Sequence, residues 1–114
     1  MPRHYVPHCG DVVSLNFTPQ AGREQAGHRT ALVLSPASYN DKTGLMVCCP
    51  MTTQIKNYPF EVPLPIGSKI RGAILAGQLK SLDWRQSRAE KLARLPTTIL
   101  DQVRERVAIL IGFT

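Results

Sequence analysis

Short apolar runs, broken at intervals by glycine and proline, fill the chain before residue 76 and constrain its fold more than any other feature. Val13, Leu15 and Phe17 alternate with Ser14 and Asn16, which is the pattern of a half-buried strand. Runs of this length with turn residues between them favour a small, curled antiparallel sheet. The predicted strands are 12–17, 30–34, 45–49, where Pro50 is expected to end the strand, 60–64 and 73–75.

The C-terminal segment has a different period. Its apolar residues recur three and four positions apart, as on one face of a helix: Ile99, Leu100, Val103, Val107, Leu110 and Ile111. Thr98 with Asp101 three residues later resembles a capping box, and Gly112 stands where a helix would end. A single helical turn that ends at Gly44 is expected within 36–44. The sequence therefore predicts an α+β class, mostly β, with a C-terminal helix across the sheet.

Length and charge limit the possible functions. A chain of 114 residues has the size of one domain, so we expect residues 1–114 to share one core. With 43% hydrophobic and 19% charged residues, the composition is that of a globular protein. The net charge of +6 and the pI of about 9.7 favour a polyanionic partner, either nucleic acid or an acidic protein.

The cysteines and the N-terminus point to a cytoplasmic protein without a metal site. Cys9, Cys48 and Cys49 have no CxxC spacing, and adjacent strand residues face opposite ways, so we expect reduced thiols rather than a disulfide or a zinc site. Residues 1–11 contain no apolar leader, and no stretch approaches the ~20 apolar residues that span a bilayer.

Two polar clusters can carry chemistry. Residues 22–29 place an acid, an amide, an imidazole and a guanidinium between glycines, and residues 52–56 supply hydroxyls, an amide and Lys56. Each cluster also has a purely structural interpretation, in which Glu24 and Arg29 form a surface ion pair and the threonines cap a turn. Tyr58 and Trp84 can stack on bases, although a core position is favoured for Trp84. The basic run Arg85, Arg88, Lys91 and Arg94 is interpreted as a solvated loop or helix face.

These motifs resemble the MazF/PemK toxin family over nearly the whole chain and in the same order, most closely its MazF branch. The matching segments are GD at 10–11, EQAGHR at 24–29, ALVLSP at 31–36, YN at 39–40, TTQ at 52–54, YPFEV at 58–62, QLKS at 78–81 and WR at 84–85. The resemblance implies an SH3-like small barrel of the CcdB/MazF type, in a homodimer. It also implies the toxin of a type II toxin–antitoxin pair, which cuts single-stranded RNA through the RNA's own 2′-hydroxyl, without metal or cofactor, and is inhibited by an acidic antitoxin.

Residue roles follow by position in the matching motifs. Arg29 and Thr52 are expected to stabilise the reacting phosphate, and Glu24 is the available base. His28 precedes Arg29 and would face the other way on a strand, so it is a weaker candidate for chemistry. Gly77 replaces an acid that relatives often carry, so base preference is expected to differ from theirs. The residues expected to contact RNA are Arg23, Gln25, His28, Thr53, Gln54, Lys56, Gln78 and Lys80.

Two other functions fit the same fold. One is a non-enzymatic toxin of the CcdB type that poisons a DNA topoisomerase, and the other is an RNA-binding barrel without activity. The Arg29 and Thr52 motifs favour the nuclease, because a binding protein needs no phosphate-facing pair of donors.

Overall fold

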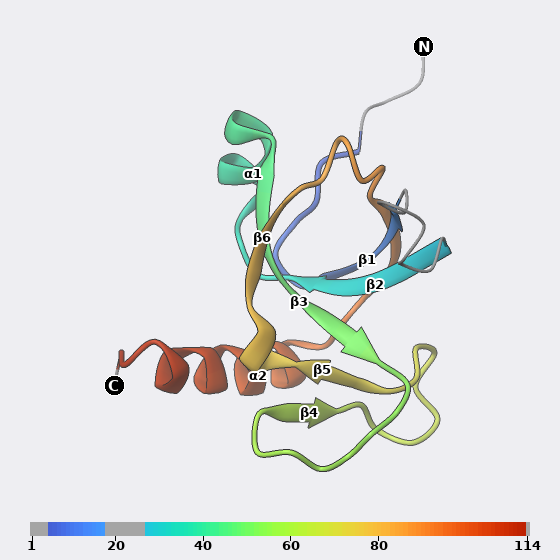
Figure 1. Ribbon diagram of the computed structural model, residues 1–114, viewed down its shortest axis with the longest axis vertical. Coiled ribbons are helices and arrows are strands. Elements are labelled where there is room, and N and C mark those ends of the chain that lie inside the picture. Colours follow the sequence, from blue (N-terminus) through green and yellow to red (C-terminus); the bar gives the residue numbers. More distant parts are fainter. Residues whose placement is uncertain (1–4, 18–26, 114) are drawn as a thin grey trace, which may run out of the picture.

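The computed structural model describes residues 5–17 and 27–113 and arranges them as a curled antiparallel sheet with a helix at each end of the molecule (Figure 1). Helix α2 lies at the end that carries β4 and β5, and α1 lies at the other end. The elements are β1 (Asp11–Phe17), β2 (Gly27–Val33), α1 (Ala37–Thr43), β3 (Leu45–Thr52), β4 (Glu61–Pro63), β5 (Ala73–Leu75), the 3-10 turn η1 (Ala76–Gln78), β6 (Lys80–Asp83), β7 (Glu90–Arg94) and α2 (Thr97–Leu110).

Strand β3 is the centre of the sheet. The strand order is β4-β5-β3-β2-β1-β7, and β6 pairs with the first half of β3 on the edge that β5 uses further along. Within the described part of the chain, no pairing joins β4 to β7. The mostly β class with a C-terminal helix is confirmed, and the expected barrel is an open, curled sheet.

Two apolar clusters lie on opposite faces of the sheet. Helix α2 covers the first, in which Ile99, Leu100 and Val103 pack against residues that include Leu32 and Cys49. The second lies inside the curl, where Trp84 closes over Val13, Leu15, Ala31, Val33, Met46 and Cys48. Adjacent Cys48 and Cys49 therefore face opposite clusters as reduced thiols, as predicted.

Three strand predictions were wrong. Strand β1 is buried on both faces from Asp11 to Leu15, rather than half-buried, because both clusters cover it. Pro50 lies inside β3, paired with Ala31. It is tolerated because, on the other edge of β3, the pairing with β6 ends at Cys48 and the pairing with β5 begins only at Met51. Within the basic run, Glu90–Arg94 is the strand β7 rather than a loop or helix face.

Helix α2 begins at Thr97, two residues earlier than a capping box with Thr98 as N-cap requires. Pro96 is its N-cap, without a side-chain cap bond, so the prediction for Thr98 was wrong. Proline suits a helix start, where its missing amide leaves no donor unpaired, and Asp101 lies 3.7 Å from Arg104 instead. At the other end Gly112 has φ 81°, and the amides of Gly112 and Phe113 donate to the carbonyls of Ile109 and Ala108. This Schellman pattern confirms the predicted stop.

A buried carboxylate ties the N-terminal segment to the sheet. Asp11 is 1% exposed and accepts hydrogen bonds from the Tyr5 hydroxyl (2.5 Å) and the His8 amide (3.1 Å). Its other oxygen lies 3.1 Å from Arg94 Nη1 and 3.8 Å from Lys91 Nζ, both on β7. The basic run is thus partly structural, because two of its cations neutralise Asp11. No helix among the described residues is long and apolar enough to cross a membrane.

Candidate active site

Strand register brings Arg29, Thr52 and Lys80 to one face of the sheet. In β2, Arg29 alternates with Ala31 and Val33, which belong to the cluster inside the curl. The β2–β3 ladder pairs Ala31 with Pro50 and ends there. Arg29 lies two residues before Ala31 on β2, and Thr52 lies two residues after Pro50 on β3. Across the other edge of β3, Lys80 pairs with Cys48, which belongs to the same cluster. The two side chains expected at the phosphate, Arg29 and Thr52, and the expected RNA contact Lys80 thus come from neighbouring strands.

A cleft of about 240 Å³ opens beside this cluster, and we call it the β2–β6 cleft. Arg29 and Lys80 supply its positive charge, and Cys48 and Pro50 form part of its wall. Burial raises the pKa of the Cys48 thiol to about 11, against the opposing effect of Lys80, so this thiol stays protonated near neutral pH. The cleft suits an anionic group. Its lining residues are Leu15, Arg29, Thr30, Ala31, Cys48, Pro50, Lys80 and Leu82.

A second cleft of about 140 Å³ lies at the end of β3, and we call it the loop cleft. It gathers most of the second polar cluster, together with Gln78 from the end of η1. Its lining residues are Thr52, Gln54, Lys56, Tyr58, Glu61, Leu75 and Gln78. Thr52 is half-buried, and Gln54, Lys56 and Gln78 are exposed. Pro50 of the β2–β6 cleft and Thr52 of the loop cleft lie two residues apart on β3, so their side chains share one face of the strand. The two clefts therefore follow one another along that face.

The position of Thr52 is fixed from two sides. Its hydroxyl oxygen accepts a hydrogen bond from the Gln54 amide at 3.1 Å, which leaves the hydroxyl hydrogen available to donate elsewhere. On the β5 side the backbone of Gly72 lies directly against it. A Cβ at Gly72, where φ is 113°, would overlap the Thr52 carbonyl oxygen and lie 2.9 Å from its carbonyl carbon. Only glycine fits there without moving Thr52.

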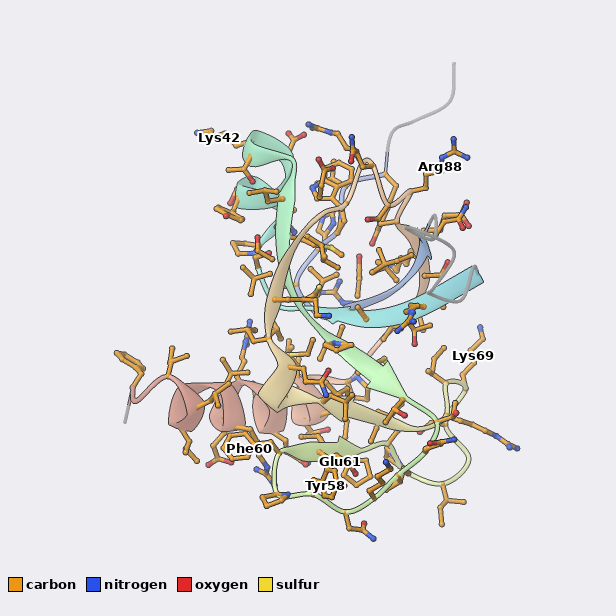
Figure 2. All side chains as sticks on the ribbon, in the orientation of Figure 1. Lys42, Tyr58, Phe60, Glu61, Lys69 and Arg88 are labelled. Carbon is orange, nitrogen blue, oxygen red and sulfur yellow. The ribbon has the colours of Figure 1, made fainter. Side chains whose placement is uncertain are left out.

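Glu61 is the site residue that sequence reasoning missed. It is 7% exposed, and its Oε1 accepts the Lys56 amide at 3.0 Å and the Asn57 amide at 2.9 Å. Figure 2 shows Glu61 on β4 with Tyr58 and Phe60 close by, and Lys42 and Arg88 at the far end of the molecule. The segment YPFEV was noted only as a family motif. An acid within a predicted strand, just after a polar loop, was the available signal.

The remaining predicted site residues divide into three groups. Glu24, Arg23 and Gln25 lie outside the described residues. The backbone of His28 pairs with Asn16 in β2, and its side chain also lies outside what is described. Thr53 is exposed beside Thr52. Among the described residues no group of three or more His, Cys, Asp or Glu side chains is placed to hold a metal ion.

The two candidate stacking residues differ. Trp84 is 6% exposed, and its Nε1 donates to the Asn40 carbonyl at 2.8 Å, which confirms the predicted core position. Tyr58 is 61% exposed on the wall of the loop cleft. A base that enters this cleft therefore has Tyr58 available as a stacking surface.

Comparison with known proteins assigns these features to a family. The family model of the PemK-like, MazF-like toxins of type II toxin–antitoxin systems matches residues 8–111. The chain is 46% identical over 112 residues to the endoribonuclease toxin MazF of Escherichia coli K12, covering 98% of this chain and 100% of that one. It is 29% identical to the Escherichia coli endoribonuclease PemK, over 90% of this chain and 80% of that one.

Solved structures agree. MazF in a MazE–MazF crystal structure from Deinococcus radiodurans superposes with a TM-score of 0.92 at 54% identity, covering 97% of this chain and 100% of that one. Neither comparison favours the alternative of a CcdB-like topoisomerase poison. The chain belongs to the PemK-like, MazF-like toxins of type II toxin–antitoxin systems, and it is an endoribonuclease of that family.

Proposed function

We propose that residues 1–114 act as one toxin domain that cleaves single-stranded RNA by attack of the 2′-hydroxyl on the adjacent phosphate. The new bond joins the 2′-oxygen to phosphorus, and the bond from phosphorus to the 5′-oxygen breaks. The products are a 2′,3′-cyclic phosphate and a 5′-hydroxyl. The single observation that carries this proposal is that Arg29 and Thr52 line two clefts that follow one another along β3, Arg29 in the β2–β6 cleft and Thr52 in the loop cleft.

Arg29 and Thr52 act as donors to the reacting phosphate. An arginine remains charged and presents a planar fork of N–H groups that fits phosphate oxygens, so Arg29 stabilises the charge of the phosphorane. The Thr52 hydroxyl accepts from the Gln54 amide and donates to a non-bridging oxygen. Donors fixed before the reaction are most effective where charge develops only in the transition state.

Proton transfer completes the reaction. The 2′-hydroxyl gives its proton to a base, for which we propose Glu24, and the departing 5′-oxygen receives a proton from an acid or from water. Because the nucleophile belongs to the RNA itself, no metal-activated water is required. Purified protein should therefore cut a long RNA in excess EDTA and leave 5′-hydroxyl ends, which can be phosphorylated directly. Activity that disappears in EDTA and returns with magnesium would refute this mechanism.

The RNA is proposed to run across both clefts. Lys80 in the β2–β6 cleft and Lys56 in the loop cleft attract the backbone, and Gln54 and Gln78 hydrogen-bond exposed base edges. Arg23, Gln25, His28 and Thr53 complete the proposed contact set. Because counterions are released when phosphates meet cations, binding should weaken as salt rises.

Inhibition by an acidic, MazE-like antitoxin is proposed as well. MazF of Deinococcus radiodurans was solved in MazE–MazF complexes, and the charge of +6 suits an acidic tail over the same clefts. In a titration of the Thr52→Ala protein, the antitoxin encoded beside the toxin should displace labelled RNA. Simultaneous binding without mutual weakening would contradict a shared surface.

We also propose a cytoplasmic homodimer. A domain of this size buries only about two-thirds of the surface of its unfolded chain. Ile109, Ile111 and Phe113 are 53%, 64% and 76% exposed at the end of α2, so a partner subunit could cover them. Light scattering at micromolar concentration should give twice the 12.6 kDa chain mass. A monomer throughout that range would contradict the proposal.

A further inference from the structure

The loop between β3 and β4 is held by one buried side chain. Glu61 Oε1 accepts the amides of Lys56 and Asn57, which are consecutive in the loop. Hydrogen bonds to a carboxylate are stronger than those between neutral groups. Asn57 has φ 59°, in the left-handed region that residues other than glycine rarely adopt. The carboxylate therefore stabilises a loop conformation that the backbone alone would disfavour.

The loop carries much of the wall of the loop cleft. Gln54, Lys56 and Tyr58 all lie between Thr52 and Glu61 and line this cleft. Further restraint comes near the ends of the loop, where the Gln54 amide donates to Thr52 Oγ1 and the Glu61 amide donates to the Tyr58 carbonyl at 3.0 Å. The two bonds to Glu61 Oε1 fix the middle. Loss of this carboxylate would release Lys56 and Tyr58 while leaving Thr52 on its strand.

We propose that Glu61 is a positioning residue that sets the base selectivity of cleavage, an inference that rests on the proposed function. By fixing the loop before RNA arrives, Glu61 holds Tyr58 to stack on one base beside the scissile phosphate. Gln54 and Gln78 then meet the edge of that base. A preformed pocket discriminates between bases because the correct base incurs little ordering cost, whereas the wrong base covers the Gln54 and Gln78 side chains without pairing with them.

Two substitutions separate positioning from chemistry. Glu61→Gln keeps a carbonyl oxygen that can accept both amides but removes the charge, and Glu61→Ala removes the acceptor. Asp11→Ala is the matched control, because it deletes another buried carboxylate whose partners are Tyr5, His8, Lys91 and Arg94. We call the two hydrogen bonds from the Lys56 and Asn57 amides to Glu61 Oε1 the clamp. Amide hydrogen exchange, measured by NMR without RNA, shows whether these two amides are protected. Sequencing of the 5′ ends from a long RNA reports selectivity.

In Glu61→Ala, exchange at the Lys56 and Asn57 amides should rise at least tenfold. The ratio of kcat/KM for the best site over its single-base variants should fall by about tenfold, in the range that misplaced contacts produce. Glu61→Gln should keep most of the amide protection and most of the selectivity ratio. Asp11→Ala should change neither the exchange at these amides nor the selectivity ratio.

Three results would overturn the proposal. One is a Glu61→Ala protein in which exchange at the Lys56 and Asn57 amides is unchanged. Another is a Glu61→Ala protein in which these amides exchange faster but the selectivity ratio is unaltered. The third is an inactive Glu61→Gln protein with protected amides, which would make the carboxylate part of the chemistry. If the wild-type protein cut no RNA, the proposed function would fail and the role in selectivity with it, while exchange would still test the clamp. If Glu61→Ala does not fold, Glu61→Gln decides the matter by its pH profile, which a positioning role leaves unchanged.

Discussion

Asp11 and Glu61 are both buried carboxylates, but they organise their regions in different ways. Asp11 joins segments far apart in sequence, since its Arg94 partner is 83 residues away, and its contacts include two cations and a phenol. Glu61 binds backbone amides only four and five residues away, and it lies in the wall of a cleft. A long-range cluster of this kind stabilises the whole fold, whereas a short-range clamp mainly sets the shape of one loop.

The comparison implies that substitution of Asp11 alters stability and leaves catalysis intact, whereas substitution of the Thr52 or Arg29 side chain alters catalysis and leaves the fold intact. Thr52 is half-buried at a strand end, and Arg29 is exposed. Neither belongs to the two apolar clusters. The difference can be tested by measuring the free energy of unfolding and the cleavage rate on the same set of variants.

The largest effect is expected at the proposed catalytic pair. Thr52→Ala or Arg29→Ala should lower the cleavage rate by about 100-fold or more, as loss of a preorganised donor usually does. Thr52→Ser should retain most of the rate because it keeps the hydroxyl, and Arg29→Lys should fall between because it keeps charge without the fork. Single-turnover cleavage of a short RNA measures the cleavage rate of each variant. Thr98→Ala, at an exposed position in α2, is the matched control. A Thr52→Ala protein that cuts at the parent rate would exclude Thr52 from the chemistry.

The next effect is expected at Gly72. A methyl group there would overlap the Thr52 carbonyl oxygen, so Gly72→Ala should shift Thr52 and lower cleavage at least tenfold, since small displacements at a site are costly. It should also cost about 1–3 kcal/mol of stability. Gly67→Ala is the matched control, because Gly67 has φ 89° in the same hairpin and a Cβ added there would meet no atom within 4 Å. Equal activity of the two variants would show that the contact with Thr52 is unimportant.

Asp11→Ala should show the opposite behaviour. Removing this carboxylate leaves the Tyr5 hydroxyl without its acceptor, and hydrogen bonds to charged groups contribute about 1.5–3 kcal/mol each. We therefore expect the free energy of unfolding to fall by about 2 kcal/mol. Arg94 and Lys91 add little to this loss, because they are 58% and 48% exposed and can return to solvent. Urea unfolding measures the free energy of unfolding. The cleavage assay should give a rate within about twofold of the parent. A large loss of rate in folded protein would remove the distinction between the two regions.

Sequence alone predicted the elements whose cause is local. The period of α2, the stop at Gly112 and the glycine that ends α1 all depend on neighbours within a few residues. The strand β7 was missed because its charged residues acquire partners only when Asp11 lies across from them, a contact that no local pattern reveals. The candidate site shows the same difference between local features, which the sequence predicted, and long-range contacts, which it did not. Arg29 and Thr52 were predicted from motifs, whereas the clamp by Glu61 and the fit of Gly72 depend on chain segments meeting in space.

The smallest effect concerns alkaline pH, to which the two buried thiols and the Tyr5 phenol respond. Burial raises the pKa of the Cys48 and Cys49 thiols to about 11 and about 12 from an ordinary value of 9.0, and it raises the pKa of Tyr5, with Asp11 adding to the effect. Raised values mean that the folded state favours the protonated forms. This stability is therefore complete below pH 9 and is lost as pH rises toward the folded-state values, because the unfolded thiols ionise first.

Between pH 9 and pH 10 each thiol should cost about 1 kcal/mol of stability. Urea unfolding across this range should show the decline, and the Cys48→Ala, Cys49→Ala double variant should flatten it. Tyr5→Phe should reduce the slope only above about pH 10, where the unfolded phenol begins to ionise. A flat profile in the parent protein would mean that the two thiols and the phenol are not desolvated in the folded state.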